Sequence, residues 1–335
     1  MSLSATKTSQ LKAPYPWFGG KSRAAHLIWE RFGQVRNFVD PFAGSMAALL
    51  NRPLPFEGVE TANDKDGYIC NFWRAIRYAK EEVAEHASGL IHECDLHARH
   101  AWLVNHREDI TRKLEGDPKW YDAEVAGWWV WGLCLWIGSG WCSGNGPWQV
   151  TEDAEGDRKL VHLGNAGQGV NRQLVHLGDS GQGVNRKRED LLDYFDQLSD
   201  RLRNVRVCCG DWKRVTGPSV TFKHGLTAVF LDPPYSAEAG RADDLYAKED
   251  YTVAHAVREW AIANGDNPQL RICVAGYENE HTFPDDWECV SWKPRGGYDG
   301  QRKDGDNDNR ERERLWFSPH CVKPELPLFA AMAAD

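Results

Sequence analysis

The segment of the chain best suited to chemistry is Asp232-Pro233-Pro234-Tyr235, which joins a carboxylate, two consecutive prolines and an aromatic ring. An exocyclic amine on a nucleobase is a poor nucleophile because its lone pair is delocalised into the ring. The Asp232 carboxylate and the Pro233 carbonyl could accept the amine hydrogens, since consecutive prolines hold the backbone extended. Tyr235 could stack on a base that has left its helix. The alternative is a strand end closed by a Pro-Pro turn, with Tyr235 packed on the sheet edge.

A second candidate group lies near the start of the chain, at Trp17, Gly19, Gly20 and Lys21. The two glycines allow a ligand to approach the backbone closely. Trp17 offers a flat apolar surface and Lys21 a positive charge. The group therefore suits a ligand with an aromatic ring and a carboxylate, such as S-adenosylmethionine. A plain turn before a helix is the alternative.

A third group follows two expected strands and consists of Asp40, Phe42, Gly44 and Asp64. In α/β nucleotide-binding units, an acidic residue after the second strand accepts hydrogen bonds from ribose hydroxyls. Asp64 occupies that position and is therefore a candidate cofactor ligand. Aspartate is also a favoured helix N-cap, and a helix is expected to follow, so capping is the alternative role of Asp64.

The expected elements place all three groups beside strand ends. The spacing of apolar residues predicts helices and strands, with helices at 45–50, 66–80 and 191–202 and strands at 37–40, 56–62, 205–208, 228–231, 271–275, 289–292 and 314–317. Strand, turn, helix, strand, acidic residue and helix is the opening of an α/β nucleotide-binding unit. The apolar strand at 228–231 runs directly into Asp232, where such sheets bind ligands.

The middle of the chain has a different character, with a Trp-rich segment at 127–148 and two copies of a Gly-rich repeat within 159–186. Two copies are too few for a solenoid, so a β-hairpin or a loop duplicated in tandem is expected. The six tryptophans favour a small hydrophobic core over base stacking. Side chains that can read bases or phosphates are the candidate DNA contacts: Asn145, Asn171, Arg172, Asn185, Arg186, Lys187 and Arg188. A surface loop without a partner is the alternative for the repeats.

Composition narrows the class of protein. The chain has 335 residues, 41% hydrophobic and 27% charged, which is typical of a soluble globular protein. It has no apolar run near the ~20 residues that span a bilayer and no signal-peptide pattern, so a cytoplasmic location is expected. The net charge of −9 does not favour a nucleic-acid partner, but binding depends on local basic patches such as 186–188 and 201–206.

The nine cysteines include no Cys-x-x-Cys pair, which favours free thiols. His92, Cys94 and His97 could imitate a metal cluster, but they have no second ligand pair at a fitting spacing. A polar helix surface is therefore expected there, and no metal is expected.

Together the motifs resemble the Dam-like DNA adenine-N6 methyltransferases of the alpha group, whose cofactor motifs precede Asp-Pro-Pro-Tyr. The matching segments, in the family's order, are 17–21, 40–45, 63–66, 71–74 and 231–235. The resemblance implies that Trp17 and Lys21 contact the cofactor, that Asp64 contacts its ribose, and that Asp232 contacts both cofactor and amine. One departure is Met46, where members often have a second glycine that frees a tight turn.

The resemblance implies an α/β fold: a Rossmann-like S-adenosylmethionine-dependent methyltransferase sheet with a mostly helical inserted recognition domain. The catalytic domain would span 12–85 and 201–322 and the insertion 86–200, with flexible tails at 1–11 and 323–335. The implied reaction moves a methyl group from S-adenosylmethionine to adenine N6 in double-stranded DNA after base flipping, leaving S-adenosylhomocysteine. It requires neither a metal nor a covalent enzyme intermediate. A monomer or weak dimer, and a stand-alone phage or prophage enzyme, are expected by analogy.

Rival functions use the same chemistry on cytosine N4, RNA adenine or a glutamine amide, or keep the fold as an inactive DNA-binding relative. Asp232 at the first motif position favours adenine, because Ser is commoner for cytosine N4 and Asn for glutamine amides. The presence of Lys21, Asp64 and the complete 232–235 segment argues against loss of activity.

Overall fold

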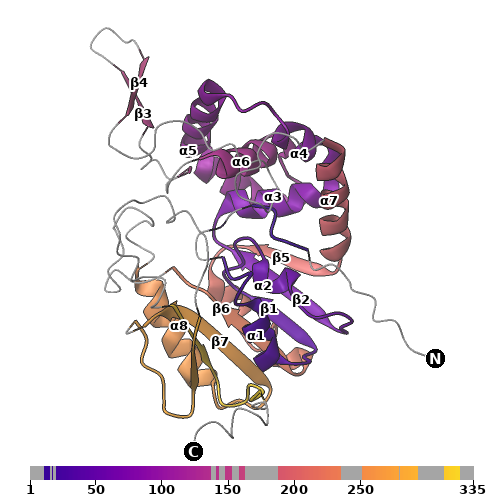
Figure 1. Ribbon diagram of the computed structural model, residues 1–335, viewed down its shortest axis with the longest axis vertical. Helices are drawn as coiled ribbons and strands as arrows, with labels where there is room; N and C mark the ends of the chain where they lie inside the picture. The colour runs from indigo at the N-terminus through magenta and orange to yellow at the C-terminus, as the bar shows by residue number, and fades with distance from the viewer. Residues whose placement is uncertain are drawn as a thin grey trace, which may run out of the picture.

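The computed structural model describes residues 11–15, 17, 20–136, 141–142, 148–152, 158–162, 188–234, 251–278, 280–292 and 313–324. Its centre is a seven-stranded sheet in the order β5-β2-β1-β6-β7-β9-β8 (Figure 1). The strands are β1 (Asn37–Asp40), β2 (Val59–Asp64), β5 (Val205–Cys209), β6 (Thr227–Leu231), β7 (Leu270–Tyr277), β8 (Glu288–Ser291) and β9 (Glu313–Phe317). Strands β5 to β7 in this order are parallel, whereas β9 runs antiparallel to both β7 and β8. The predicted mixed α/β fold is confirmed.

The order of the strands reverses beside β1. The chain adds β2 and β5 on one side of β1 and then crosses to add β6 and β7 on the other side. In open α/β sheets, such a switch point creates a crevice at the carboxyl ends of the two central strands. Asp40 is the last residue of β1 and Asp232 follows β6, so two predicted site residues lie at this crevice.

Helices cover both faces of the sheet, which explains why its strands are apolar. The helices beside the strands are α1 (Ala25–Phe32), α2 (Ala47–Leu50), α3 (Gly67–Tyr78) and α8 (Tyr251–Asn264). Alternate residues of β7 enter two separate cores: Cys273 and Ala275 join the cluster that contains α1, and Ile272 and Val274 join the one that contains α8. All five residues of β6 are buried, as is typical of a parallel strand covered on both faces.

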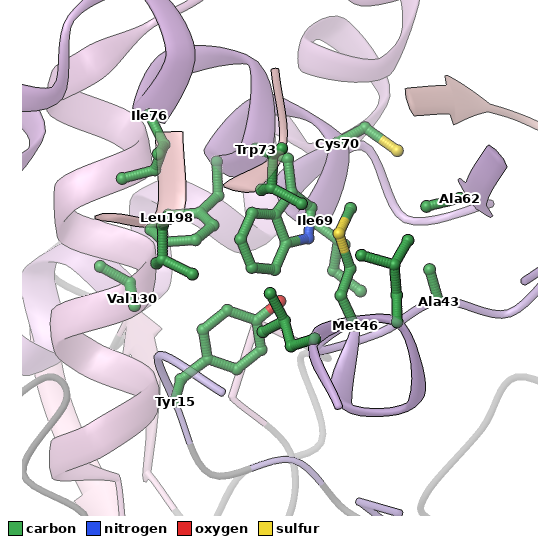
Figure 2. Close-up of a cluster of buried hydrophobic side chains, with 14 of the residues drawn as sticks. Tyr15, Ala43, Met46, Ala62, Ile69, Cys70, Trp73, Ile76, Val130 and Leu198 are labelled. Carbon is green, nitrogen blue, oxygen red and sulfur yellow. The ribbon is translucent and has the colours of Figure 1, made fainter. Parts of the chain in front are cut away.

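The segment between β2 and β5 is mostly helical. After α3 it contains α4 (Lys80–Ala87), α5 (Glu93–Gly116), α6 (Ala123–Leu135), the hairpin of β3 (Trp148–Glu152) and β4 (Arg158–His162), and α7 (Arg188–Arg201). Figure 1 shows these helices gathered above the β5 side of the sheet. One apolar cluster runs from the sheet through α3 to α6 and α7. Figure 2 shows part of it, with Tyr15, Met46, Val130 and Leu198 among its members. A separate recognition domain at 86–200 remains a prediction.

Four of the six tryptophans of the middle segment are buried: Trp129, Trp131, Trp136 and Trp141. The Trp141 indole N–H donates to the Trp129 carbonyl at 3.0 Å. The Trp141 ring also lies so close to Gly132 that a Cβ there would be 1.9 Å from it. The predicted hydrophobic core is therefore confirmed for these four rings.

Several local predictions differ from the structure. β2 begins at Val59 rather than Phe56, because Gly58 has φ +128° and a Cβ there would lie 1.7 Å from the Arg36 carbonyl oxygen. The chain turns at Gly58 and cannot continue a strand through it. The first repeat copy begins within β4, which pairs with β3, a strand outside the repeat; residues 163–186 lie outside the described part.

The prediction that His92, Cys94 and His97 form a polar helix surface is wrong for His97, which is buried. His92 caps α5 by accepting from Asp95 N–H, and Cys94 is exposed. His97, in contrast, is buried against the Trp136 ring at 6.0 Å, because it faces the aromatic core. The helices α1 and α8 were not predicted. Within the described ranges, no helix combines the length and apolarity needed to cross a membrane.

Candidate active site at the carboxyl edge of the sheet

A contact between Lys21 and Asp232 joins two of the predicted groups, 17–21 and 232–235. Lys21 Nζ donates to both carboxylate oxygens of Asp232, at 2.9 Å each. The Lys21 side chain is 2% exposed and that of Asp232 is 20% exposed. A buried ammonium requires such partners because an unpaired charge loses its hydration without compensation. Pro233 is buried and Pro234 is partly exposed, while Tyr235 lies outside the described residues.

The turn after β1 brings Trp17, Gly44 and Asp64 together. The Gly44 N–H donates to Asp64 Oδ2 at 2.9 Å. Gly44 has φ +46°, and a Cβ there would lie 2.5 Å from Trp17 Nε1. Only glycine therefore fits both the left-handed backbone and the indole that covers it. The Tyr15 hydroxyl donates to the Gly44 carbonyl at 2.9 Å and ties the turn to the apolar cluster.

Met46 adopts the left-handed backbone conformation. A glycine, which family members often have at this position, would adopt it without strain. The φ and ψ of Met46 are 55° and 26°, a region that costs an L-residue about 1–2 kcal/mol. Its side chain is 1% exposed and packs in the apolar cluster (Figure 2). Burial of a methionine side chain contributes about 1.5–3 kcal/mol and offsets this strain. The departure from the family pattern thus leaves the tight turn in place.

Asp64 ends β2 and faces the turn after β1. Its carboxylate accepts hydrogen bonds from the N–H groups of Gly44 and Asp66, at 2.9 Å each. The cap of α3 is Asp66, whose side chain accepts from Tyr68 N–H at 2.8 Å, so the alternative role of Asp64 as that cap is wrong. Burial raises the pKa of Asp64 to about 6, opposed by the backbone N–H groups of Asp66 and Gly44. Asp64 is therefore mostly an ionised acceptor near neutral pH.

Asp40 is a deeply buried acid between two other acids. Burial raises the pKa of Asp40 well above its usual range, and the charges of Asp232 and Asp64 raise it further. The Phe42 N–H and Lys21 act in the opposite direction. Among the described residues, Asp40 Oδ1 has no hydrogen-bond partner, although the residue is 2% exposed. Such an atom requires a partner from a ligand or from elsewhere in the chain.

Two further groups lie at the same edge and were not predicted. Asp211 and Trp212 follow β5, and the Trp212 ring lies 6.1 Å from the ring of Phe42. The Gly210 N–H donates to the Asp64 carbonyl at 2.9 Å, which ties this loop to the end of β2. Glu313 and Trp292 approach Lys21 from β9 and from the end of β8. A search of all predicted strand ends for polar residues would have found Asp211.

Most of the predicted DNA contacts lie outside the described part of the chain. Six of them and one cofactor candidate fall outside the described residues: Gly19, Asn145, Asn171, Arg172, Asn185, Arg186 and Lys187. Arg188 begins α7, but its side chain is not described. In the basic series at 201–206, Arg201 is engaged in two ion-paired hydrogen bonds to Glu60, at 2.6 and 2.9 Å, so it is not a free phosphate ligand.

No group of three or more His, Cys, Asp or Glu side chains in the described part of the chain is arranged to hold a metal ion. The nine cysteines are all free thiols. What the edge does hold is acid: Asp232 and Glu313 lie near Lys21, and the charges of Asp232 and Asp64 both act on Asp40. A surplus of carboxylates suits a cationic ligand.

Comparison with known families agrees with this geometry. Residues 17–118 match the family model described as D12 class N6 adenine-specific DNA methyltransferase, which confirms the resemblance to the Dam-like enzymes. The match includes Trp17, Lys21, Gly44 and Asp64 and ends before β5, so Asp232 lies outside it. No curated protein matches the chain.

Proposed function

We propose that this chain, which its residues 17–118 identify as an enzyme of the D12 class of N6 adenine-specific DNA methyltransferases, transfers a methyl group from S-adenosylmethionine to adenine in double-stranded DNA. The observation that carries the proposal is the pair of 2.9 Å hydrogen bonds from Lys21 to Asp232. They join the segment that matches the family to the Asp-Pro-Pro-Tyr segment beyond the match. The proposed fold is correspondingly a Rossmann-like methyltransferase domain with the middle segment inserted.

The residues at the switch point fit S-adenosylmethionine, a cation with ribose hydroxyls, an ammonium and an adenine ring. Asp64 offers a carboxylate for the hydroxyls, and Asp40 offers an unpartnered buried oxygen. The Trp17 indole lies against Gly44, closer than a Cβ would allow, so its ring borders the turn that Asp64 holds. We assign the cofactor to these groups together with Gly19, Gly20, Lys21, Phe42 and Asp232. When bound, S-adenosylmethionine supplies a methyl group made electrophilic by its sulfonium.

Asp232 and the Pro233 carbonyl activate the target amine. Each accepts one amine hydrogen, which opposes delocalisation of the nitrogen lone pair into the ring. The two hydrogen bonds from Lys21 fix the Asp232 carboxylate in orientation, which is the main contribution a positioned acceptor makes. The methylated nitrogen is strongly acidic, so its proton leaves without a strong base.

Binding of DNA requires basic groups outside this acidic edge. Base flipping is required because stacking shields the amine within the duplex, and Tyr235 is the proposed stacking partner. We place DNA recognition on the inserted segment, with Asn145, the repeat residues and 186–188 as contacts. Arg201 is excluded from this surface by its ion pair with Glu60.

The experiment that tests the substrate class offers methyl-labelled S-adenosylmethionine together with duplex DNA, single-stranded DNA, RNA or a protein extract as the only acceptor. We expect label in unmethylated duplex DNA and much less in the others. Label that enters only RNA or protein would overturn the proposed substrate. A Lys21→Met variant serves as the control for site-dependent transfer, because it removes the contact to Asp232 while the Asp64 turn is kept.

A further inference from the structure

Glu313 is a second carboxylate near the Lys21 ammonium. Its Oε2 lies 4.0 Å from Lys21 Nζ, and its side chain is 7% exposed. The ring of Trp292 lies 5.7 Å from the same Nζ. The ammonium therefore faces two carboxylates, those of Asp232 and Glu313, and one aromatic ring, with almost no access to water.

The antiparallel end of the sheet places these residues. Because β9 runs opposite to β7, it begins at the edge where the parallel strands end, and its first residue, Glu313, is the register partner of Tyr277. β8 runs in the same direction as β7 and ends at that edge with Trp292 next in the chain. The backbone N–H of Trp292 donates to the backbone carbonyl of Glu313 at 3.4 Å. The antiparallel direction of β9 thus places Glu313 at the carboxyl edge of the parallel strands.

Two carboxylates of the described residues lie near the Lys21 ammonium. Lys21 supplies one positive charge, and Asp232 alone would neutralise it with its two hydrogen bonds. Glu313 adds a second carboxylate at ion-pair distance without replacing either of those bonds. Lys21 and Glu313 are 2% and 7% exposed, so little solvent screens the attraction between their charges. Glu313 therefore restrains the ammonium by charge.

We propose that Glu313 is a positioning residue for methyl transfer: its carboxylate fixes the Lys21 ammonium, and Lys21 in turn presents the Asp232 carboxylate to the target amine in one orientation. This role rests on the proposed function. Without the charge of Glu313, one of the two carboxylates described beside the ammonium is lost, and the Lys21–Asp232 pair can reorient together. Transfer then slows, and cofactor binding changes little, because Asp64 and Gly44 hold their contacts independently of Glu313.

The kinetic test compares Glu313→Gln, Glu313→Asp and the matched control Glu288→Gln. Glu288 lies on the neighbouring β8 and pairs with Arg31 at 2.7 Å, away from the site. At saturating S-adenosylmethionine and DNA, Glu313→Gln should reduce the transfer rate by about 10- to 100-fold, the range that small misplacements cause. Its Kd for S-adenosylmethionine should stay within about threefold of wild type. Glu313→Asp should recover part of the rate, and Glu288→Gln should keep all of it.

A second readout does not depend on activity. Urea unfolding of wild type, Glu313→Gln, Lys21→Met and the double variant forms a thermodynamic cycle. Glu313→Gln should lower the free energy of unfolding in wild type, where it removes the contact with Lys21, and should lower it less in the Lys21→Met background, where that contact is already absent. Equal effects in both backgrounds, or a wild-type transfer rate in Glu313→Gln, would overturn the role of Glu313. Absence of adenine methylation by the wild-type enzyme would instead refute the proposed function.

Discussion

The carboxyl edge of the sheet and the inserted helices are built from different interactions. At the edge, a few charged side chains are buried in fixed pairs, such as Lys21 with Asp232 at 2.9 Å. In the helices, packed rings dominate, such as Trp141 against Gly132. Substitutions at the edge should therefore damage the reaction, and substitutions in the helices should damage stability.

The largest effect is expected for Asp232→Asn. The amide keeps the shape of the side chain but presents a donor where the target amine needs an acceptor, and it weakens the contact to Lys21. The transfer rate should fall by about 10²–10³-fold, the range associated with the loss of one positioned hydrogen-bonding group. Rates at saturating substrates, measured beside the Kd for S-adenosylmethionine, check this. A variant with more than about a tenth of wild-type turnover would break the assignment of chemistry to the edge.

Gly132→Ala probes the helical region. A Cβ at this position would lie 1.9 Å from the Trp141 ring, so the ring must move within a packed core. We expect a loss of about 1–3 kcal/mol in the free energy of unfolding, typical of overpacking, with the transfer rate of the folded fraction retained. Gly116→Ala is the control, since nothing lies within 4 Å of its added Cβ. A loss of turnover without a loss of stability would show that the helices take part in the chemistry.

The pH dependence of stability reports on the buried acids. The pKa of Asp64 is about 6 in the folded protein and about 3.9 in an unfolded chain, so the folded state holds this proton more tightly. The contribution of Asp64 to the free energy of unfolding is greatest below about pH 4, and it is lost as pH rises through about 6. Asp64→Asn removes this pH-dependent contribution. As pH rises from about 4 to about 6, the free energy of unfolding of Asp64→Asn should therefore increase relative to that of wild type by about 2 kcal/mol, after allowance for partial exposure.

Urea unfolding from pH 4 to pH 7.5 measures this difference, with the exposed Asp285→Asn as the control. Burial also raises the pKa of Asp40. Asp40 therefore lowers stability with rising pH in both wild type and Asp64→Asn. A constant difference between Asp64→Asn and wild type over the window contradicts the raised pKa of Asp64.

The smallest effect concerns Met46, where glycine should be tolerated better than alanine. Both substitutions lose the buried side chain, but only glycine relieves the left-handed backbone at φ 55°. Met46→Gly should therefore be more stable than Met46→Ala by about 1 kcal/mol. At Ala48, inside α2, glycine should instead cost about 1 kcal/mol. Thermal unfolding of these variants tests whether the turn after β1 is strained.

The sequence predicted the parts of the site that follow from strand ends. Asp40, Asp64 and Asp232 were placed correctly because a short apolar run predicts a strand and the residue after it reaches the carboxyl edge. Glu313 could not be placed in this way, since an apolar run does not reveal whether its strand runs parallel or antiparallel. The cap of α3 was also ambiguous, because Asp64 and Asp66 both precede the helix and only the Gly44 contact separates them.

The most direct test of the account is the identity of the methylated nucleoside. Unmethylated duplex DNA is incubated with methyl-labelled S-adenosylmethionine and the enzyme, digested to nucleosides and analysed by mass spectrometry. We predict label in N6-methyladenine, formed at less than about a tenth of the wild-type rate when Asp232→Asn replaces the wild-type enzyme. Label in N4-methylcytosine, or N6-methyladenine formed by Asp232→Asn at more than about a tenth of the wild-type rate, contradicts the proposed reaction.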